Sequence, residues 1–337
     1  MDDPRTSPPP HLPTDKPSVA RMYDYYLGGH HNFAIDRAAA EAVLAIAPDI
    51  GPGAQANRAF LRRVVRFLIA HGVTQFLDIG AGIPTVGNTH EVAGAADPAA
   101  RVVYVDIDPV AVAHARAILG DHPYATAIAA DAREPAALLA HPAVRGLLDF
   151  ERPVAVLLLA FLHLLPDDEE ARRVVAAFVA ALPPGGYLAI AHATVEGASP
   201  AQIAQIERLY AGTTTPATFR PRAAIAAFFA GLELVEPGLV PAPLWHPEAA
   251  DDVLLDAPAR SLNLVGLGRK PGPATPVTPV TPVTPARRSR WTRPRTLPCT
   301  PRSSRGGRRS PTAGTARSPA PASSRSAGRR CAPACWS

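Results

Sequence analysis

From residue 75 onward the chain alternates apolar runs with stretches of helical periodicity, and short polar segments connect them. Five mostly apolar runs predict strands at 75–79, 101–106, 124–129, 153–161 and 187–193. Strands that alternate with helices in this way are typical of βαβ units and a parallel sheet. Two later runs, 231–237 and 261–269, alternate polar and apolar residues, which favours an antiparallel pair at one edge. The predicted fold class is therefore α/β, with a doubly wound, mostly parallel sheet of seven strands.

A helical extension precedes the first strand. Between residues 53 and 70, apolar side chains recur at helical spacing, and Gly72 supplies a stop signal. Upstream, a helix start is interrupted at Gly28 and Gly29, and a second helical stretch runs over 34–47. These segments predict a helical cap over residues 17–72.

Composition divides the chain into unlike parts. Residues 271–337 hold 13 arginines, no lysine and no acidic residue, and they contain the repeat TPVTPVTPVTP and all three cysteines. Such a segment cannot bury enough apolar surface to offset the entropy of ordering, so we expect a disordered tail. We also expect a disordered N-terminus at 1–16, the helical cap at 17–72 and the main domain at 73–270.

The charge and the motifs of the chain limit the kinds of partner that it is expected to bind. The first 270 residues carry more acidic than basic side chains, which argues against a duplex-binding face on the core. Weak, non-specific contact with nucleic acid is expected only from the arginine-rich tail. The N-terminus does not resemble a signal peptide, and no apolar run spans a bilayer, so we expect a cytoplasmic protein without membrane contact. Because HExxH and paired CxxC motifs are missing, we predict no metal.

Candidate chemistry lies where the predicted strands end. In the sequence QFLDIGAGIP, Asp78 is followed by Gly80 and Gly82, a pattern in which glycines let the backbone approach a nucleoside closely. Asp106 ends the next strand, where a carboxylate can accept both hydroxyls of a ribose. Asp131 follows the third strand. We expect Asp78 to contact a charged amine, Asp106 a ribose and Asp131 an adenine amino group.

Seven segments together resemble one known family. They are PSVARMYDYYLGGHHNF, NRAFLRR, QFLDIGAGIPT, VVYVDIDPV, LLDFERPVAVLLLAFLHLLPDDE, LPPGGYLAIAHAT and GLELVEPGLVP. The chain resembles class I S-adenosylmethionine-dependent methyltransferases, and within them an actinobacterial S-adenosyl methyltransferase family once described as a domain of unknown function. The resemblance implies a Rossmann-like fold, S-adenosylmethionine as cofactor and methyl transfer to an acceptor expected to be a small molecule. The cofactor-binding residues expected from the strand ends and the resemblance are Asp78, Gly80, Gly82, Asp106, Ile107, Asp131, Ala132 and Ala160.

Five further residues are candidates for contact with the acceptor. His163 follows the fourth strand, where an imidazole can take a proton near neutral pH; the alternative is that it fixes a helix start. His192 on the fifth strand is either an acceptor contact or a packed histidine. Tyr23, Tyr26 and Asn32 flank the Gly28-Gly29 turn and either form a lid or pack between helices.

Two other functions remain open from the sequence. A nicotinamide-dependent oxidoreductase shares the Gly-x-Gly pattern and the acid after the second strand, but the third glycine of its fingerprint is missing and an acid ends the third strand. A non-catalytic module that binds and senses S-adenosylmethionine would use the same residues without transferring a methyl group.

Overall fold

One mixed sheet organises the protein. The computed structural model describes residues 15–83, 87–248 and 253–272, which belong to one compact unit. Its strands are β1 (Gln75–Ile79), β2 (Arg101–Asp106), β3 (Ala125–Ala129), β4 (Ala155–Leu159), β5 (Tyr187–Ala193), β6 (Glu233–Leu234), β7 (Val240–Pro241) and β8 (Asn263–Arg269). The strand order is β3-β2-β1-β4-β5-β8-β6, and β7 also pairs with β8. The first five strands are mutually parallel, and β8 is antiparallel to its neighbours.

Helices connect and cover the strands. The α-helices are α1 (Val19–Tyr26), α2 (Ala34–Ile46), α3 (Ile50–Ala70), α4 (Thr89–Ala96), α5 (Pro109–Leu119), α6 (Pro135–Ala140), α7 (Pro142–Leu147), α8 (Asp168–Ala181), α9 (Pro200–Tyr210) and α10 (Arg222–Ala227). Three short 3₁₀ turns are η1 (Leu162–Leu164), η2 (Ala242–Leu244) and η3 (Pro258–Ser261). Helix α5 begins with a side-chain cap: the Asp108 carboxylate accepts a hydrogen bond of 2.8 Å from the Val110 N–H, and Pro109 opens the helix.

The core lies on both faces of the sheet. On one face, side chains of α3, α4 and α5 pack against strand residues such as Phe76 and Tyr104; on the other, α6, α7 and α8 pack against residues such as Leu77 and Val156. All five residues of β1 and of β4 are buried. Continuous burial explains why β4, with the sequence AVLLL, is apolar along its whole length, whereas β1 also buries the polar residues Gln75 and Asp78.

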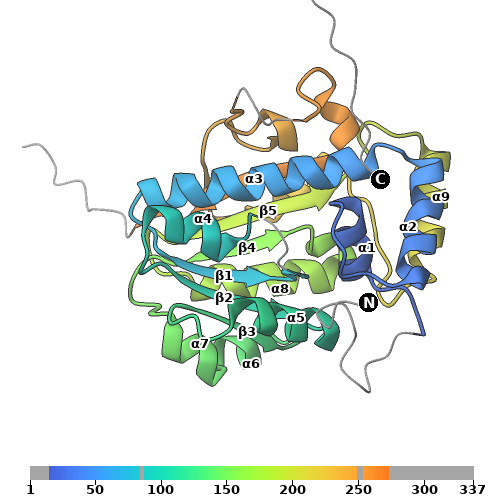
Figure 1. Ribbon diagram of the computed structural model, residues 1–337. Helices are drawn as coiled ribbons and strands as arrows, with labels where there is room; N and C mark the ends of the chain where they lie inside the picture. The colour runs from blue at the N-terminus through green and yellow to red at the C-terminus, as the bar shows by residue number, and fades with distance from the viewer. Residues whose placement is uncertain (1–14, 84–86, 249–252, 273–337) are drawn as a thin grey trace, which may run out of the picture. The chain divides into compact units, whose positions relative to one another are not determined.

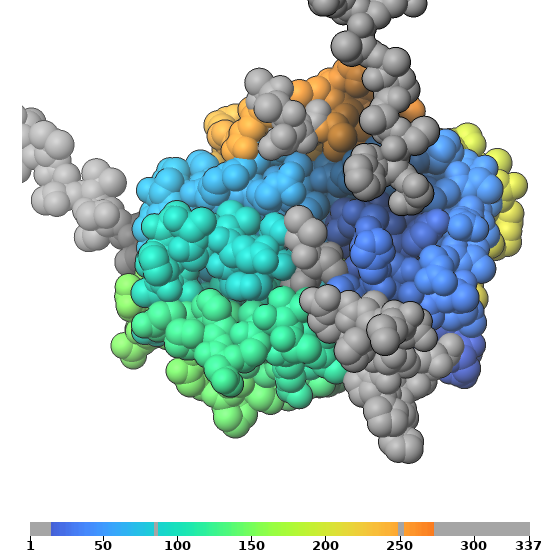
Figure 2. Space-filling view, viewed as in Figure 1, coloured from blue at the N-terminus to red at the C-terminus, as the bar shows by residue number. Residues whose placement is uncertain are grey.

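The strand order reverses between β1 and β4. The chain leaves β1 toward β2 and β3 on one side, and later strands continue from β4 on the other. Such a reversal leaves a crevice beyond the carboxyl ends of the strands. Figure 1 shows α1, α2 and α9 gathered at this end, and Figure 2 shows the blue surface of α1 and α2 beside it.

The structure confirms the predicted fold class and refines one edge. Strands over 75–79, 101–106 and 187–193 have the predicted bounds. The run 231–237 forms only the two-residue β6, because the chain turns at Pro237 and Gly238, where proline offers no N–H to a ladder. After the turn, β7 adds an eighth strand that the sequence did not predict.

The predicted domain boundaries at residues 16, 72 and 270 stay predictions. The N-terminal segment 1–14 and the tail from 273 onward lie outside the described residues. No helix of the described part is long and apolar enough to cross a membrane.

Candidate functional site

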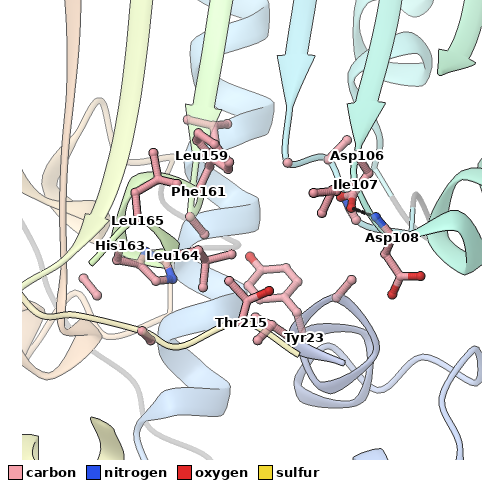
Figure 3. Close-up of a pocket in the computed structure, with 18 of the residues that line it drawn as sticks. Tyr23, Asp106, Ile107, Asp108, Leu159, Phe161, His163, Leu164, Leu165 and Thr215 are labelled. Carbon is pink, nitrogen blue, oxygen red and sulfur yellow. Dashed lines mark hydrogen bonds between the residues drawn. The ribbon is translucent and has the colours of Figure 1, made fainter. Parts of the chain in front are cut away.

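A cavity of about 540 Å³ lies at the carboxyl ends of the parallel strands, beside α1. Its volume falls within the roughly 300–1,000 Å³ that small-molecule and cofactor sites occupy. Most predicted site residues line it: Tyr23, Tyr26, Asp78, Gly80, Gly82, Asp106, Ile107, Asp131, Ala132, Ala160 and His163. In Figure 3, Asp106 and Ile107 lie on one side of the cavity and His163 on the other, with Tyr23 and Thr215 between them.

The cavity has two chemically different halves. We call the part formed by Asp78, Gly80, Gly82, Asp106 and Asp131 the strand-tip half. The part that we call the apolar half is formed by residues of a separate cluster at α1, η1, α9 and the loop after α9: Tyr26, Leu164, Tyr210, Ala217 and Phe219. The first half carries the charge, and the second is lined by apolar and aromatic groups.

Two glycines after β1 let the backbone approach the cavity. Gly80 and Gly82 have φ values of +67° and +62°, in the left-handed region that side chains rarely adopt. A Cβ on Gly80 would lie 2.7 Å from the Phe161 ring. The local geometry therefore demands glycine at position 80 for reasons of both conformation and space.

Asp106 is held rigidly at the end of β2. Its Oδ2 accepts a hydrogen bond of 2.8 Å from the Gly82 N–H, and its Oδ1 accepts one of 2.9 Å from the Asp108 N–H. Burial raises the pKa of Asp106, and the two backbone donors oppose that shift. Ile107 follows with its side chain 57% exposed. The carboxylate is thus fixed by the same loop that carries the glycines.

Asp78 is a buried acid with one neutral partner. The Thr89 hydroxyl donates a hydrogen bond of 2.7 Å to its Oδ2. Burial raises the pKa of Asp78 to about 6, although the hydrogen bond from Thr89 and the Arg58 guanidinium act in the opposite direction. A bound cation would offset the cost of burying this charge, so the position suits an ammonium group.

Asp131 and Ala160 complete the strand-tip half. Asp131 forms an ion pair of 2.6 Å with Arg133, which holds the pKa of that carboxyl below its usual value. Ala160 directly follows β4 and has a φ of +58°, unusual for a residue with a Cβ. Its N–H donates to the Ala191 carbonyl at 2.9 Å, which pins the strand end beside the cavity. Such a conformation persists where surrounding structure imposes it, often at ligand sites.

His163 lines the cavity as a neutral imidazole. It lies in η1, and its Nδ1 is buried without a hydrogen-bond partner in the described structure. Burial, followed by the nearby Arg220 guanidinium, lowers the pKa of His163 to about 4. The ring can therefore accept a hydrogen bond at neutral pH, but it is a weak base.

The structure places His192 away from the cavity, contrary to its predicted contact with the acceptor. The side chain is fully buried; its Nδ1 lies 2.6 Å from the Ala193 carbonyl and its Nε2 lies 3.0 Å from the Arg220 guanidinium. Side chains alternate between the faces of a strand, and His192 lies on the face that packs against Phe228. His192 is thus a packed histidine that contacts Arg220.

Arg220 is a structural residue of the site that sequence reasoning missed. Although almost fully buried, it donates to the Leu162 and Leu165 carbonyls at 2.9 and 2.7 Å and to Asp168 at 2.7 Å. These bonds fix the loop between β4 and α8, which carries His163. Arg220 lies in the segment TTTPATFRPRAA, which contains a second arginine, Arg222, and nothing in the sequence distinguishes the buried one from the other.

The N-terminal helices meet the cavity through Tyr23 and Tyr26. The Tyr23 hydroxyl accepts a hydrogen bond of 2.8 Å from Asn57 and donates to the Ala54 carbonyl at 3.2 Å. The Tyr26 and Tyr210 hydroxyls lie 3.4 Å apart, and burial raises the pKa of both. These contacts cross from α1 to α3 and α9, so the predicted lid residues Tyr23 and Tyr26 also pack between helices.

Asn32 does not line the cavity. Its Nδ2 donates to the Asp24 carboxylate at 2.8 Å and to the Gly29 carbonyl at 2.9 Å. It therefore stabilises the turn after α1, a role different from the predicted contact with the acceptor. The N-terminal ends of α1 and α5 are joined directly by their cap residues, because the Ser18 hydroxyl donates a hydrogen bond of 2.6 Å to the Asp108 carboxylate.

Within residues 15–83, 87–248 and 253–272, no group of three or more His, Cys, Asp or Glu side chains could hold a metal ion.

Two known structures resemble this chain closely. A candidate methyltransferase from Thermobifida fusca YX is 43% identical, with a TM-score of 0.73 over 79% of this chain and 99% of its own. A DUF574 family protein from Streptomyces avermitilis MA-4680 is 37% identical, with a TM-score of 0.72 over 77% of this chain and 99% of its own. A comparison with curated proteins gives no match.

The family model for S-adenosyl methyltransferases matches residues 5–271. Neither this match nor the two structures support a nicotinamide-dependent oxidoreductase or a non-catalytic sensing module. S-adenosylmethionine is accordingly the cofactor. The chain belongs to the S-adenosyl methyltransferase family.

Proposed function

We propose that the protein transfers a methyl group from S-adenosylmethionine to a small, uncharged acceptor. The observation that carries this proposal is one cavity lined both by the glycine loop with the acids Asp78, Asp106 and Asp131 and by a group of apolar and aromatic side chains. The first half suits a charged nucleoside cofactor and the second an apolar molecule. The two halves belong to one cavity.

The strand-tip half fits the cofactor. Asp106 would accept hydrogen bonds from the ribose hydroxyls. The buried Asp78 would pair with the ammonium group, whose charge offsets the cost of burying the carboxylate. Gly80 and Gly82 would bring the backbone close to the cofactor. Ile107, Asp131, Ala132 and Ala160 would enclose the adenine. When bound, S-adenosylmethionine supplies an electrophilic methyl group.

The apolar half constrains the acceptor. Tyr26, Tyr210 and Phe219 supply rings, and Leu164 and Ala217 complete the surface. Because this group holds no charged side chain, an ionic acceptor would lose its hydration without compensation. An uncharged molecule with an aromatic or aliphatic body matches the lining, and the enclosure orients it toward the cofactor.

His163 adds one polar contact to this apolar surface. With a pKa lowered to about 4, its imidazole is neutral at pH 7, and its unpartnered Nδ1 can accept a hydrogen bond from an acceptor O–H or N–H. We infer that it orients the nucleophilic atom and takes its proton only as the new bond to carbon forms. Arg220 opposes an imidazolium at this site.

The experiment has two steps. Calorimetric titration of the purified protein with S-adenosylhomocysteine and, separately, with NAD⁺ identifies the cofactor; the proposal requires binding of the first. Transfer of a labelled methyl group into fractionated cell extract then finds the acceptor, with Asp106→Ala as the inactive variant and the exposed Asp121→Ala as its matched control. Label in the small-molecule fraction, lost only in Asp106→Ala, is the expected result. Label in protein or nucleic acid, or equal labelling by both variants, would overturn the proposal.

A further inference from the structure

Two residues of helix α3 that line the cavity each carry a buried polar atom without a hydrogen-bond partner in the described structure. Asn57 and Arg58 both line the cavity, although α3 is otherwise largely buried against the sheet. Asn57 donates from Nδ2 to the Tyr23 hydroxyl, but its Oδ1 is buried and has no hydrogen-bond partner in the described structure. The Arg58 Nε is likewise buried and unpartnered.

Arg58 also lacks a carboxylate partner. No ion pair joins it to any acid within the described parts of the chain; its guanidinium lies 5.9 Å from the centre of the Tyr23 ring. Buried donors and acceptors are nearly always satisfied in folded proteins, since leaving one unpaired forfeits its hydration. An unpaired donor and an unpaired acceptor on consecutive residues that line one cavity point to a ligand that supplies the two missing partners.

The charges around the cavity indicate the polarity of that ligand. Asp78 and the glycine loop line the same cavity as Asn57 and Arg58. A guanidinium has only donors, so it selects an anionic group, whereas a carboxylate and an amide oxygen select a donor such as ammonium. A group that carries both a carboxylate and an ammonium matches this set. Arg58 influences Asp78 electrostatically, which is consistent with their facing one small group.

We propose that Arg58 binds the α-carboxylate of the cofactor's methionyl group and that Asn57 Oδ1, together with Asp78, accepts hydrogen bonds from its α-ammonium. This inference rests on the proposed function and assigns the amino-acid end of the cofactor to helix α3. Because α3 also contacts Tyr23 through Asn57, the same helix joins the cofactor site to the N-terminal segment.

Two ligands that differ only in the amino-acid end provide the test. S-adenosylhomocysteine carries the zwitterion, while 5′-deoxy-5′-methylthioadenosine keeps the adenosine and the thioether but has no amino or carboxyl group. Calorimetry would measure both ligands on the wild type, Arg58→Met, Arg58→Lys and Arg66→Met. Arg66 is the matched control, since it lies on the same helix but pairs with Glu248 outside the cavity.

Arg58→Met should weaken S-adenosylhomocysteine binding about 10- to 100-fold and change methylthioadenosine binding less than about 3-fold. Arg58→Lys should recover part of the loss, and Arg66→Met should bind both ligands as the wild type does. Circular dichroism and thermal unfolding verify that each variant is folded.

Three outcomes count against this account. Unchanged binding of S-adenosylhomocysteine to Arg58→Met, or an equal loss for both ligands, would overturn the role of Arg58. If the wild type itself bound no S-adenosylhomocysteine, the proposed function would fail and not merely this inference.

Discussion

The two halves of the cavity are built in different ways. The strand-tip half comes from β1, β2 and the segment after β3. Asp106 is held by backbone N–H groups of the adjoining loops, Asp78 by the Thr89 hydroxyl and Asp131 by Arg133. The apolar half is assembled from α1, η1, α9 and the loop after α9, segments that lie nearly 200 residues apart in the chain. One half is defined by local geometry and the other by tertiary packing. Cofactor binding and acceptor choice should therefore respond to different substitutions.

The largest effect should come from removing the anchor of the loop between β4 and α8. Arg220→Met should lower the free energy of unfolding by about 3 kcal/mol, because three hydrogen bonds from a side chain only 3% exposed are lost and buried carbonyls are left unpaired. Arg222→Met is the matched control. Its guanidinium is 43% exposed and pairs with Glu196 at the surface, so we expect less than about 1 kcal/mol. Urea unfolding measures both; equal losses would refute the buried anchor.

A substitution in the strand-tip half should break cofactor binding next. Gly80→Ala places a methyl group 2.7 Å from the Phe161 ring at a φ of +67°, so we expect about 1–3 kcal/mol of lost stability and roughly 10- to 100-fold weaker S-adenosylhomocysteine binding. Gly94→Ala in α4 is the control, since nothing lies within 4 Å of the added methyl group. It should bind normally and gain about 0.5–1 kcal/mol. Normal binding by Gly80→Ala would contradict the close approach.

The charge of Asp78 should give the strand-tip half a pH dependence. Its pKa is about 6 in the folded protein and 3.8 in the ordinary case, so burial favours the protonated form. The contribution of the protonated Asp78 carboxyl to the free energy of unfolding is complete below pH 3.8 and is lost as the pH rises through 6. Asp78→Asn should therefore unfold with a free energy about 2 kcal/mol higher than the wild type at pH 7, and the difference should vanish at low pH.

Binding should show the opposite preference. Between pH 7 and pH 5 the wild type should lose about 10-fold in affinity for S-adenosylhomocysteine, because protonation removes the charge that meets the ammonium group. Asp78→Asn should bind weakly with little dependence on pH. Calorimetry at several pH values measures this dependence. If the affinity of the wild type did not change between pH 7 and pH 5, an ionic role for Asp78 would be excluded.

The smallest effect should come from His163 in the apolar half. His163→Leu removes a buried nitrogen that has no hydrogen-bond partner, so we expect the free energy of unfolding to rise by about 1 kcal/mol. S-adenosylhomocysteine binding should be unchanged, while transfer to the acceptor falls. Thermal unfolding and calorimetry separate these effects. A loss of stability, or of cofactor affinity, would mean that His163 serves the strand-tip half or the fold.

The same contrast explains what the sequence could predict. The bounds of β1, β2 and β5 follow from apolar runs between turn residues, and Asp78, Gly80 and Asp106 lie in the cavity because strand ends of a parallel sheet share one edge. Their roles in binding remain proposals.

Other positions relative to the cavity depend on which face of a strand a side chain occupies, or on packing between segments far apart in the chain. His192 points to Arg220 because its strand position faces away from the cavity, and no periodicity within a buried, continuously apolar strand reveals this. Asn57 and Arg58 reach the cavity because α3 packs beside β4 and β8. Helical periodicity alone does not predict this, although NRAFLRR is one of the segments that resemble the family.

The most direct test of the central claim is a crystal structure of the protein with S-adenosylhomocysteine. We predict the ligand in the cavity of about 540 Å³, with its ribose hydroxyls hydrogen-bonded to Asp106 and its amino-acid end between Asp78 and Arg58. A ligand bound elsewhere, or one whose ribose does not contact Asp106, would contradict the account.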